Sequence, residues 1–328
     1  MKNILSRLFE HKKLSRTEAR EILVNISNNE YNEAQIAAFM TVYLMRVISV
    51  EELQGFRDAL LELCLPIDLE GIESVDIVGT GGDGKNTFNI STISSFVVSG
   101  AGYKVTKHGN YGVSSACGSS NVLEYLGYQF TNDEDTLKRQ LEKANICFFH
   151  APLFHPAMKT VAPIRRQLGV KTFFNMLGPL VNPGQPKYQL LGVFNLELSR
   201  LYEYIFQQTQ RQFSIVYAMD GYDEISLTGD FKLRNNSGEH TFSPSEIGKQ
   251  KLDPNDLKGG DTVEAAAKIF VDILEGKGTK AQNDVISTNA GVAINCIKPN
   301  QALEDSIAEA YESLLSGNAL QNFKNLVN

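Results

Sequence analysis

The first part of the chain, residues 1–70, carries apolar patterns that are typical of helices. Residues 34–47 are apolar almost throughout, which predicts a buried helix rather than one with a single apolar face. Ser15 and Ser49 each precede a charged turn with a glutamate three residues later, as in a capping box at the start of a helix. These signals predict a small unit of four helices.

After residue 70 the pattern changes to short apolar runs that end in glycine or polar residues, which is typical of buried parallel strands. Such runs lie at residues 75–79, 103–109, 147–151, 188–194 and 213–220. Helical patterns separate several of them, at residues 90–102, 133–144 and 195–209. Residues 229–244 predict an exposed hairpin, and helices are predicted again at 262–276 and 301–317.

This alternation of strands and helices predicts an α/β fold with crossover helices. The expected architecture is a small N-terminal α-helical domain at residues 1–70 and a larger α/β domain at residues 71–328. The larger domain has a central, mostly parallel sheet. A helical segment near residues 160–182 is expected to join the small domain.

Composition narrows the class of protein. Of the 328 residues, 42% are apolar and 21% are charged, as in an ordinary soluble globular protein. The formal net charge of −7 disfavours nucleic-acid binding, because neutralising phosphates requires a basic surface. No window approaches the roughly 18 apolar residues of a membrane helix, no signal peptide is indicated, and the four cysteines lack metal-binding spacing. A cytoplasmic protein with reduced thiols is expected.

The most informative stretch is the glycine-rich segment that follows the strand at residues 75–79. It has glycines at positions 79, 81, 82 and 84, then polar residues, and a helix is predicted to start near Ser91. Glycines allow positive φ angles and let backbone N–H groups approach an anion, and a helix N-terminus adds partial positive charge. The segment therefore predicts a phosphate or pyrophosphate site.

Two common phosphate-binding motifs fit this segment only in part. The glycine spacing matches a dinucleotide-binding loop, but the acidic residue expected about 20 positions later is absent, because position 99 is Ser99. Residues 79–85 match most of a P-loop, but Asn86 stands where a magnesium-binding hydroxyl is required. Neither motif accounts for the whole segment.

Two further polar elements follow predicted strands. Residues 107–119 combine a lysine, an asparagine, glycines and serines, and Lys107 lies at the end of a strand, where ligands of α/β sheets gather. Asp223 and Glu224 are adjacent carboxylates after the strand at 213–220. They suit magnesium, a hard ion that prefers oxygen ligands.

Taken together, these elements resemble the anthranilate phosphoribosyltransferases. The matching segments are GTGGD at 79–83, NIST at 89–92, KHGN at 107–110, FNMLGPLVNP at 174–183 and the DE pair at 223–224, and the resemblance extends to NAG at 289–291. It implies a magnesium-dependent enzyme of tryptophan biosynthesis. Such an enzyme transfers the phosphoribosyl group of phosphoribosyl pyrophosphate (PRPP) to the amine of anthranilate.

The resemblance also implies which residues form each binding site. Those implied for PRPP are Gly79, Gly82, Asp83, Thr87, Asn89, Ile90, Ser91, Thr92, Lys107, His108, Gly109, Asn110, Tyr111, Gly112, Val113, Ser114, Ser115 and Ser119. Those implied for anthranilate are Gly79, Asn110 and Arg165, with the adjacent Arg166 as the alternative arginine. The implied magnesium ligands are Ser91, Asp223 and Glu224, with two Mg²⁺ ions per site.

No residue identifies itself as a general base. His108 is a candidate proton acceptor, and a structural histidine beside the loop is the favoured interpretation. The family implies a homodimer formed through the helical domain, for which residues 37–47 are apolar enough. No glutamine amidotransferase segment precedes the helices, so a monofunctional chain is expected.

Two other functions stay open as alternatives. A pyrimidine nucleoside phosphorylase has a similar fold and a KH element, but its glycine loop starts differently from the DIVGTGGDG of this chain. A non-enzymatic, nucleic-acid-binding relative of the same fold should be basic, whereas this chain is acidic.

Overall fold

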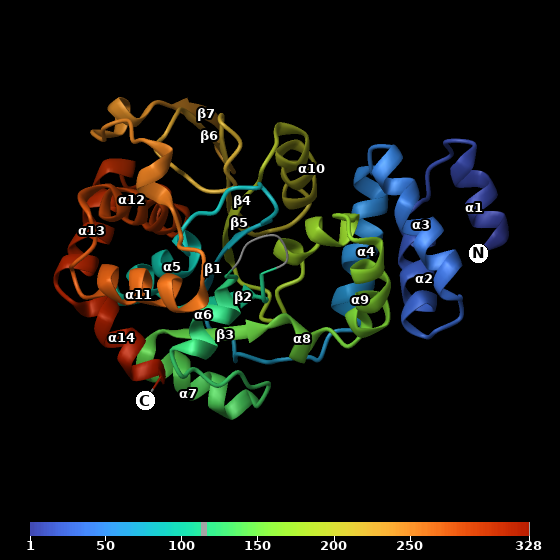
Figure 1. Ribbon diagram of the computed structural model, residues 1–328, viewed down its shortest axis with the longest axis horizontal. Helices are drawn as coiled ribbons and strands as arrows, with labels where there is room; N and C mark the ends of the chain where they lie inside the picture. Colours follow the sequence, from blue (N-terminus) through green and yellow to red (C-terminus); the bar gives the residue numbers. More distant parts are fainter. Residues whose placement is uncertain (113–116, 328) are drawn as a thin grey trace. The chain divides into compact units, whose positions relative to one another are not determined.

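The computed structural model describes residues 1–112 and 117–327 and divides into two compact units (Figure 1). We call the first, Met1–Ile67 with Ala151–Pro183, the helical unit. We call the second, Asp68–His150 with Gly184–Asn328, the sheet unit. The second segment of the helical unit begins at Ala151, earlier than the expected start near residue 160.

Helices account for most of the helical unit. They are α1 (Lys2–Phe9), α2 (Arg16–Ser27), α3 (Glu33–Met45), α4 (Val50–Glu62), α8 (Ala151–Phe154) and α9 (Ala157–Leu168), with short 3₁₀ turns η1 (Phe173–Met176) and η2 (Gly178–Leu180). The predicted capping boxes at Ser15 and Ser49 are both present. Phe39, Phe56 and Phe173 form an aromatic cluster with ring centroids 4.5–6.0 Å apart, so the second segment shares the core of the first.

In the described part of the sheet unit, seven strands form one sheet in the order β3-β2-β1-β4-β5-β6-β7. Their bounds are β1 (Val75–Gly79), β2 (Val105–Gly109), β3 (Ile146–His150), β4 (Tyr188–Gly192), β5 (Gln212–Ala218), β6 (Phe231–Asn235) and β7 (Gly238–Phe242). β1 to β5 pair in parallel, and β6 and β7 add an antiparallel hairpin. The mostly parallel sheet and the hairpin at residues 229–244 are thus as predicted.

The helices of the sheet unit connect and cover these strands (Figure 1). They are α5 (Ile90–Gly100), α6 (Ser119–Tyr125), α7 (Glu134–Ala144), α10 (Leu196–Phe206), α11 (Val263–Leu274), α12 (Lys280–Ile297), α13 (Leu303–Leu315) and α14 (Asn318–Val327), with η3 (Pro244–Ile247) and η4 (Pro254–Leu257). Among the described residues, no helix is long and apolar enough to cross a membrane.

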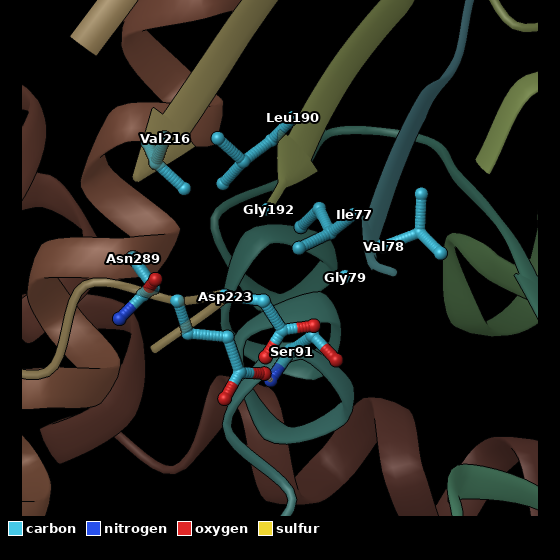
Figure 2. Close-up of a pocket in the computed structure, with 10 residues that line it drawn as sticks. Ile77, Val78, Gly79, Ser91, Leu190, Gly192, Val216, Asp223 and Asn289 are labelled. Carbon is cyan, nitrogen blue, oxygen red and sulfur yellow. Dashed lines mark hydrogen bonds between the residues drawn. The ribbon is translucent and has the colours of Figure 1, made fainter. Parts of the chain in front are cut away.

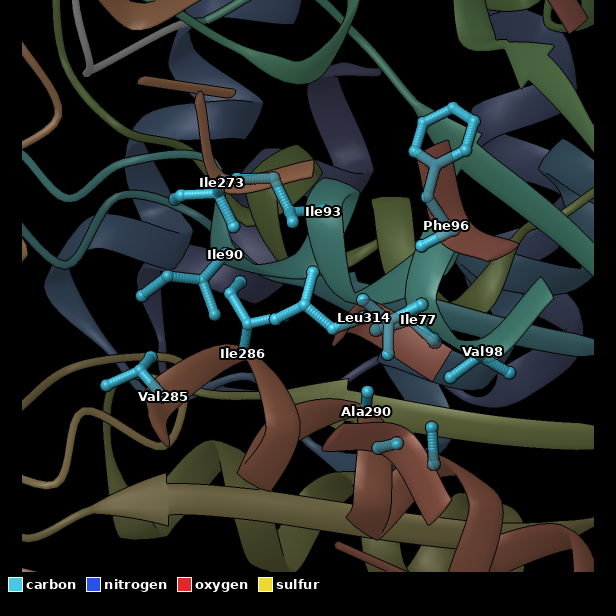
Figure 3. Close-up of a cluster of buried hydrophobic side chains, with 14 of the residues drawn as sticks. Ile77, Ile90, Ile93, Phe96, Val98, Ile273, Val285, Ile286, Ala290 and Leu314 are labelled. Carbon is cyan, nitrogen blue, oxygen red and sulfur yellow. The ribbon is translucent and has the colours of Figure 1, made fainter. Parts of the chain in front are cut away.

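Helix α12 is the central helix of this unit, and the sequence pattern did not predict it. Of its 18 residues, 13 are buried, and they face the sheet as well as neighbouring helices. Figure 3 shows Ile286 and Ala290 of α12 beside Ile77 of β1 and Ile93 of α5. A helix buried on nearly all sides has no single apolar face, so the 3.6-residue periodicity that reveals amphipathic helices is absent.

Candidate active site

The candidate active site lies at the carboxyl ends of the parallel strands of the sheet unit. A cavity opens there between strand ends, the start of α5, the loop after β5 and helix α12 (Figure 2). It is lined by Ile77, Val78, Gly79, Ser91, Leu190, Gly192, Val216, Asp223, Glu224 and Asn289. Ligands of open α/β sheets bind at this edge, because the connecting loops gather there.

Two glycines make room for the carboxylates at this edge. Gly79 of β1 and Gly192 of β4 are register partners in adjacent strands. A Cβ atom at Gly79 would lie 2.4 Å from Oδ2 of Asp223, and one at Gly192 would lie 1.6 Å from the backbone oxygen of Asp223. Only glycine permits so close an approach. The sequence reasoning missed Gly192, although a glycine at the end of a buried strand is a signal of such an approach.

The glycine loop between β1 and α5 has the backbone that its sequence predicts. Gly81, Gly82 and Gly84 have φ angles of 64°, 77° and 76°, in the left-handed region. The backbone N–H of Gly81 donates to Oδ2 of Asp223 at 2.6 Å. Helix α5 then begins at Ile90, as expected near Ser91, so its N-terminus faces the same edge.

Residues predicted for PRPP in and after this loop fall into two groups. Asp83, Thr87 and Asn89 are partly exposed, whereas Ile90 and Thr92 are buried. Ile90 belongs to the apolar core shown in Figure 3, and its backbone N–H donates to the backbone oxygen of Phe88 at 2.6 Å, so it shapes the loop from within the core.

Asp223, which is buried, and Glu224, which is partly buried, form an acidic pair. Oε1 of Glu224 accepts a hydrogen bond from the backbone N–H of Ser91 at 2.9 Å, and Asp223 accepts the one from Gly81. Burial, and then the nearby charge of Asp83, raises the pKa of Asp223. Burial, and then the charge of Asp223, raises the pKa of Glu224. A cation between them would relieve this repulsion.

The donor set fits a magnesium ion. Two carboxylates and the partly buried hydroxyl residue Ser91 line one cavity and supply oxygen ligands only. Within residues 1–112 and 117–327, no group of three or more His, Cys, Asp or Glu residues is arranged to hold a metal ion. Mg²⁺ typically keeps waters and binds through one or two carboxylates plus phosphate oxygens, which is consistent with this incomplete set.

Lys107 lies in the middle of β2 and not at a strand end as predicted, and its ammonium reaches the start of α5. Its side chain is buried, and Nζ donates to the backbone oxygen of Ile77 at 2.5 Å and lies 3.5 Å from Oγ of Ser91. Burial lowers the pKa of Lys107, while the charges of Asp76 and Glu224 oppose that shift. The neighbouring backbone N–H of His108 donates to Oδ1 of Asp76 at 3.1 Å, and the His108 side chain is buried.

The second polar element closes onto the start of helix α6. Oγ of Ser119 donates to the backbone oxygen of Asn110 at 3.3 Å, and a Cβ at Gly109 would lie 2.6 Å from that Oγ. Oδ1 of Asn121 accepts from the backbone N–H groups of Gly112 and Gly118 at 2.9 and 3.0 Å. Asn121 is therefore a loop-holding residue that the sequence reasoning missed.

The two phosphate-binding elements predicted from the sequence lie together. Nδ2 of Asn89, in the glycine loop, donates to the backbone oxygen of Cys117 at 3.2 Å. Tyr111 is exposed, and its hydroxyl donates to Oε1 of Glu124 at 3.3 Å. Val113, Ser114 and Ser115, also predicted for PRPP, lie outside the described residues.

The residues predicted for anthranilate belong to different units. Gly79 and Asn110 are in the sheet unit, whereas Arg165 is in α9 of the helical unit. Nη2 of Arg165 donates to Oδ1 of Asn175 at 3.2 Å, and burial lowers the pKa of Arg165. Arg166 is exposed. Of the two arginines, Arg165 is therefore the one whose guanidinium is partly buried and fixed by a hydrogen bond.

Comparison with known proteins places this geometry in a family. The chain matches the glycosyl transferase family models, the helical bundle domain over residues 2–64 and the a/b domain over residues 71–320. It is 57% identical to the anthranilate phosphoribosyltransferase of Cytophaga hutchinsonii, with 100% of both chains covered. It is also 57% identical to that of Flavobacterium psychrophilum, over 99% of this chain and 98% of the relative.

Solved structures agree. The anthranilate phosphoribosyltransferase of Saccharomyces cerevisiae in complex with PRPP and Mg superposes with a TM-score of 0.90 at 27% identity, covering 98% of this chain and 95% of that one. That of Thermus thermophilus gives a TM-score of 0.88 at 30% identity, covering 98% of each chain. The chain therefore belongs to the anthranilate phosphoribosyltransferase family, a group of pentosyltransferases within the glycosyl transferases.

Proposed function

We propose that this protein transfers the 5-phosphoribosyl group of PRPP to the amine of anthranilate. The products are N-(5-phosphoribosyl)anthranilate and pyrophosphate, in tryptophan biosynthesis. The observation that carries the proposal is the meeting of the glycine loop, the N-terminus of α5, Lys107 and the pair Asp223–Glu224 at one sheet edge. Relatives at 57% identity over nearly the whole chain support anthranilate as the acceptor, and disfavour the phosphorylase and the nucleic-acid-binding alternatives.

The chain's own groups suit the departure of pyrophosphate. Breaking the bond at the anomeric carbon leaves positive charge on the ribose and negative charge on the leaving oxygens. Backbone N–H groups of the loop that contains Gly81 and Gly84, the start of α5 and the ammonium of Lys107 supply positive potential there. Such preorganised donors stabilise the developing charge without reorganisation.

We propose Ser91, Asp223 and Glu224 as the residues that hold Mg²⁺, with two ions per site. Magnesium bound there supplies positive charge that neutralises the pyrophosphate. The yeast relative whose structure holds PRPP and Mg supports this choice of ion. The two carboxylates, whose burial and acidic surroundings raise their pKa values, support the choice of residues.

For the acceptor we propose Gly79, Asn110 and Arg165. A guanidinium binds a carboxylate through two parallel hydrogen bonds, so Arg165 suits the carboxylate of anthranilate. The same yeast enzyme has been solved in complex with 4-fluoroanthranilate. An aniline nitrogen is weakly basic, so orientation of the amine is the main requirement and no general base is assigned. His108 stays a candidate proton acceptor, and its buried side chain favours a structural role.

We also propose that the protein is a cytoplasmic homodimer that associates through the helical unit. Leu44, Met45 and Val47 are exposed by 46%, 82% and 57%, and they follow the buried part of α3. Apolar side chains gathered at a surface mark interaction sites. Sedimentation velocity of the wild type and of Met45→Glu tests the dimer, which the charge should dissociate.

The activity can be tested by the loss of anthranilate fluorescence when PRPP is added, with Mg²⁺ and with EDTA. We expect a decrease with Mg²⁺ and none with EDTA. An unchanged signal with Mg²⁺, from a protein whose circular dichroism shows it to be folded, contradicts the proposed acceptor. A phosphate-dependent thymidine cleavage assay serves as the control for the phosphorylase alternative.

A further inference from the structure

Asn289 is a buried polar residue of helix α12 that contacts the loop carrying the two carboxylates. Its Oδ1 accepts from the backbone N–H of Ile225 at 3.0 Å, and its Nδ2 donates to the backbone oxygen of Ile225 at 2.9 Å. Nδ2 also donates to the backbone oxygen of Val285 within α12 at 2.9 Å. The side-chain amide is thus hydrogen-bonded to both the backbone N–H and the backbone oxygen of the residue that follows Glu224.

The backbone of the loop after β5 depends on tertiary contacts such as these hydrogen bonds. Leu227 has a φ of 59°, in the left-handed region that branched side chains avoid, so local preferences do not maintain this backbone. The opposite side of the loop rests on the strand end at Gly192, where a side chain would meet the backbone of Asp223. The carboxylate pair is therefore held between the sheet edge and α12.

Asn289 is also placed to act on the cavity. It lines the cavity together with Ser91, Asp223 and Glu224, and Figure 2 shows it reaching in from α12 on the side of Asp223. The three hydrogen bonds of its side-chain amide are made with backbone atoms of Ile225 and Val285, and not with groups inside the cavity. It therefore works through the loop.

We infer that Asn289 is a positioning residue that sets the geometry of Asp223 and Glu224 for cation binding. This inference rests on the proposed metal site. Residues that orient metal ligands from behind typically change metal affinity by 10–100-fold when they are replaced. Loss of Asn289 should accordingly weaken metal binding, beyond any loss of stability.

The test measures metal binding without turnover. Mn²⁺ is titrated into the full-length protein in the presence of PRPP, and free Mn²⁺ is followed by electron paramagnetic resonance. We expect Asn289→Ala to raise the Kd for Mn²⁺ about tenfold. Asn289→Leu keeps the buried volume, removes the same hydrogen bonds, and should give the same increase if the alanine variant does not fold.

Thr288→Val is the matched control. Thr288 is the preceding residue of α12, is also buried, and its hydroxyl donates to the backbone oxygen of Asp284 in the same helix at 2.7 Å. It should keep the wild-type Kd. A folded Asn289 variant with the wild-type Kd and a lower melting temperature overturns the inference, since that is the result of a purely structural role.

The outcome is separable from that of the proposed function. If the Asn289 variants bind Mn²⁺ about tenfold more weakly than the wild type, yet the wild type does not consume anthranilate, the proposed acceptor is wrong and the inference stands. If the wild type with PRPP binds no Mn²⁺, the metal site and the inference both fall.

Discussion

Each unit of the molecule buries a carboxylate, and the surroundings differ: Glu52 has an arginine partner, whereas Asp223 has acidic neighbours. Glu52 of the helical unit accepts from Nη2 of Arg46 at 2.5 Å, from the backbone N–H groups of Leu14 and Ser49 at 2.9 Å each, and from the hydroxyl of Tyr43. Burial by itself would raise the pKa of Glu52, but the hydrogen bonds from Arg46 and the two backbone groups outweigh it and lower that pKa.

Asp223 and Glu224 of the sheet unit have the opposite balance. Asp223 accepts from the backbone N–H of Gly81 and Glu224 from that of Ser91, and burial together with neighbouring acidic charge raises both pKa values. A carboxylate whose oxygens are satisfied within the protein stabilises the fold, whereas an under-satisfied pair attracts a ligand. The comparison separates a structural acid from a functional one by the charges around it, although Glu52 and Asp223 are both buried.

The largest expected effect is on the functional pair. Asp223→Asn combined with Glu224→Gln should lower the initial rate at limiting Mg²⁺ by about 1000-fold, because the charges proposed to hold the ion are gone. The melting temperature should not fall, since a repulsion is removed. Fluorescence assays over a range of Mg²⁺ concentrations measure the rate. Asp230→Asn, an exposed acid of the same segment, is the control, and full turnover of the double variant refutes the metal assignment.

The structural acid should show the reverse behaviour. Glu52→Gln leaves the charge of Arg46 without its partner, so we expect the free energy of unfolding to fall by about 3 kcal/mol. Turnover per folded molecule should be unchanged. Urea unfolding gives the stability, and the exposed neighbour Glu51, changed to Gln, is the control. If Glu52→Gln loses turnover and keeps its stability, Glu52 is not a purely structural acid and the contrast with Asp223 and Glu224 is wrong.

A smaller effect tests whether the helical unit contributes to acceptor binding. Arg165→Ala should raise the KM for anthranilate about tenfold, the order expected for losing a hydrogen bond to a charged group, and leave the KM for PRPP nearly unchanged. Steady-state kinetics with each substrate varied in turn measures both. The adjacent Arg166→Ala is the control, and a larger effect there shows that the wrong arginine was assigned.

The smallest expected effect tests the direction of the pKa shift of Glu52. The pKa of Glu52 is lower in the folded protein than its ordinary value of 4.5, so the unfolded state binds the proton first. Its stabilisation is present above that value and is lost as the pH falls toward the folded pKa. Stability of the wild type should therefore drop below pH 4.5 by about 1 kcal/mol per pH unit more than that of Glu52→Gln. Urea unfolding of both proteins between pH 6 and 3.5 measures the free energy of unfolding at each pH. If the two proteins lose stability equally as the pH falls, the prediction is wrong.

Much of the fold was predictable because its signals are local. Caps such as Ser15 and Ser49, and strands that end in glycine such as residues 75–79, depend on a few neighbouring residues. Helix α12 was not predictable, because its burial on nearly all sides removes the periodicity. The hydrogen bonds between Asn289 and Ile225 link residues 64 positions apart, and no local sequence pattern indicates such a pair.

The sequence by itself determined the loop chemistry of this protein: glycines at the end of β1, the cation of Lys107 in the next predicted strand, and two adjacent acids after β5. Residue type decides which backbone angles and which charges are available at those positions. Only the tertiary structure decided that Gly192 leaves room for Asp223, that Asn89 meets Cys117, and that Asn289 holds the acidic loop. These contacts join segments far apart in the chain, and packing of the sheet against α5 and α12 brings them together.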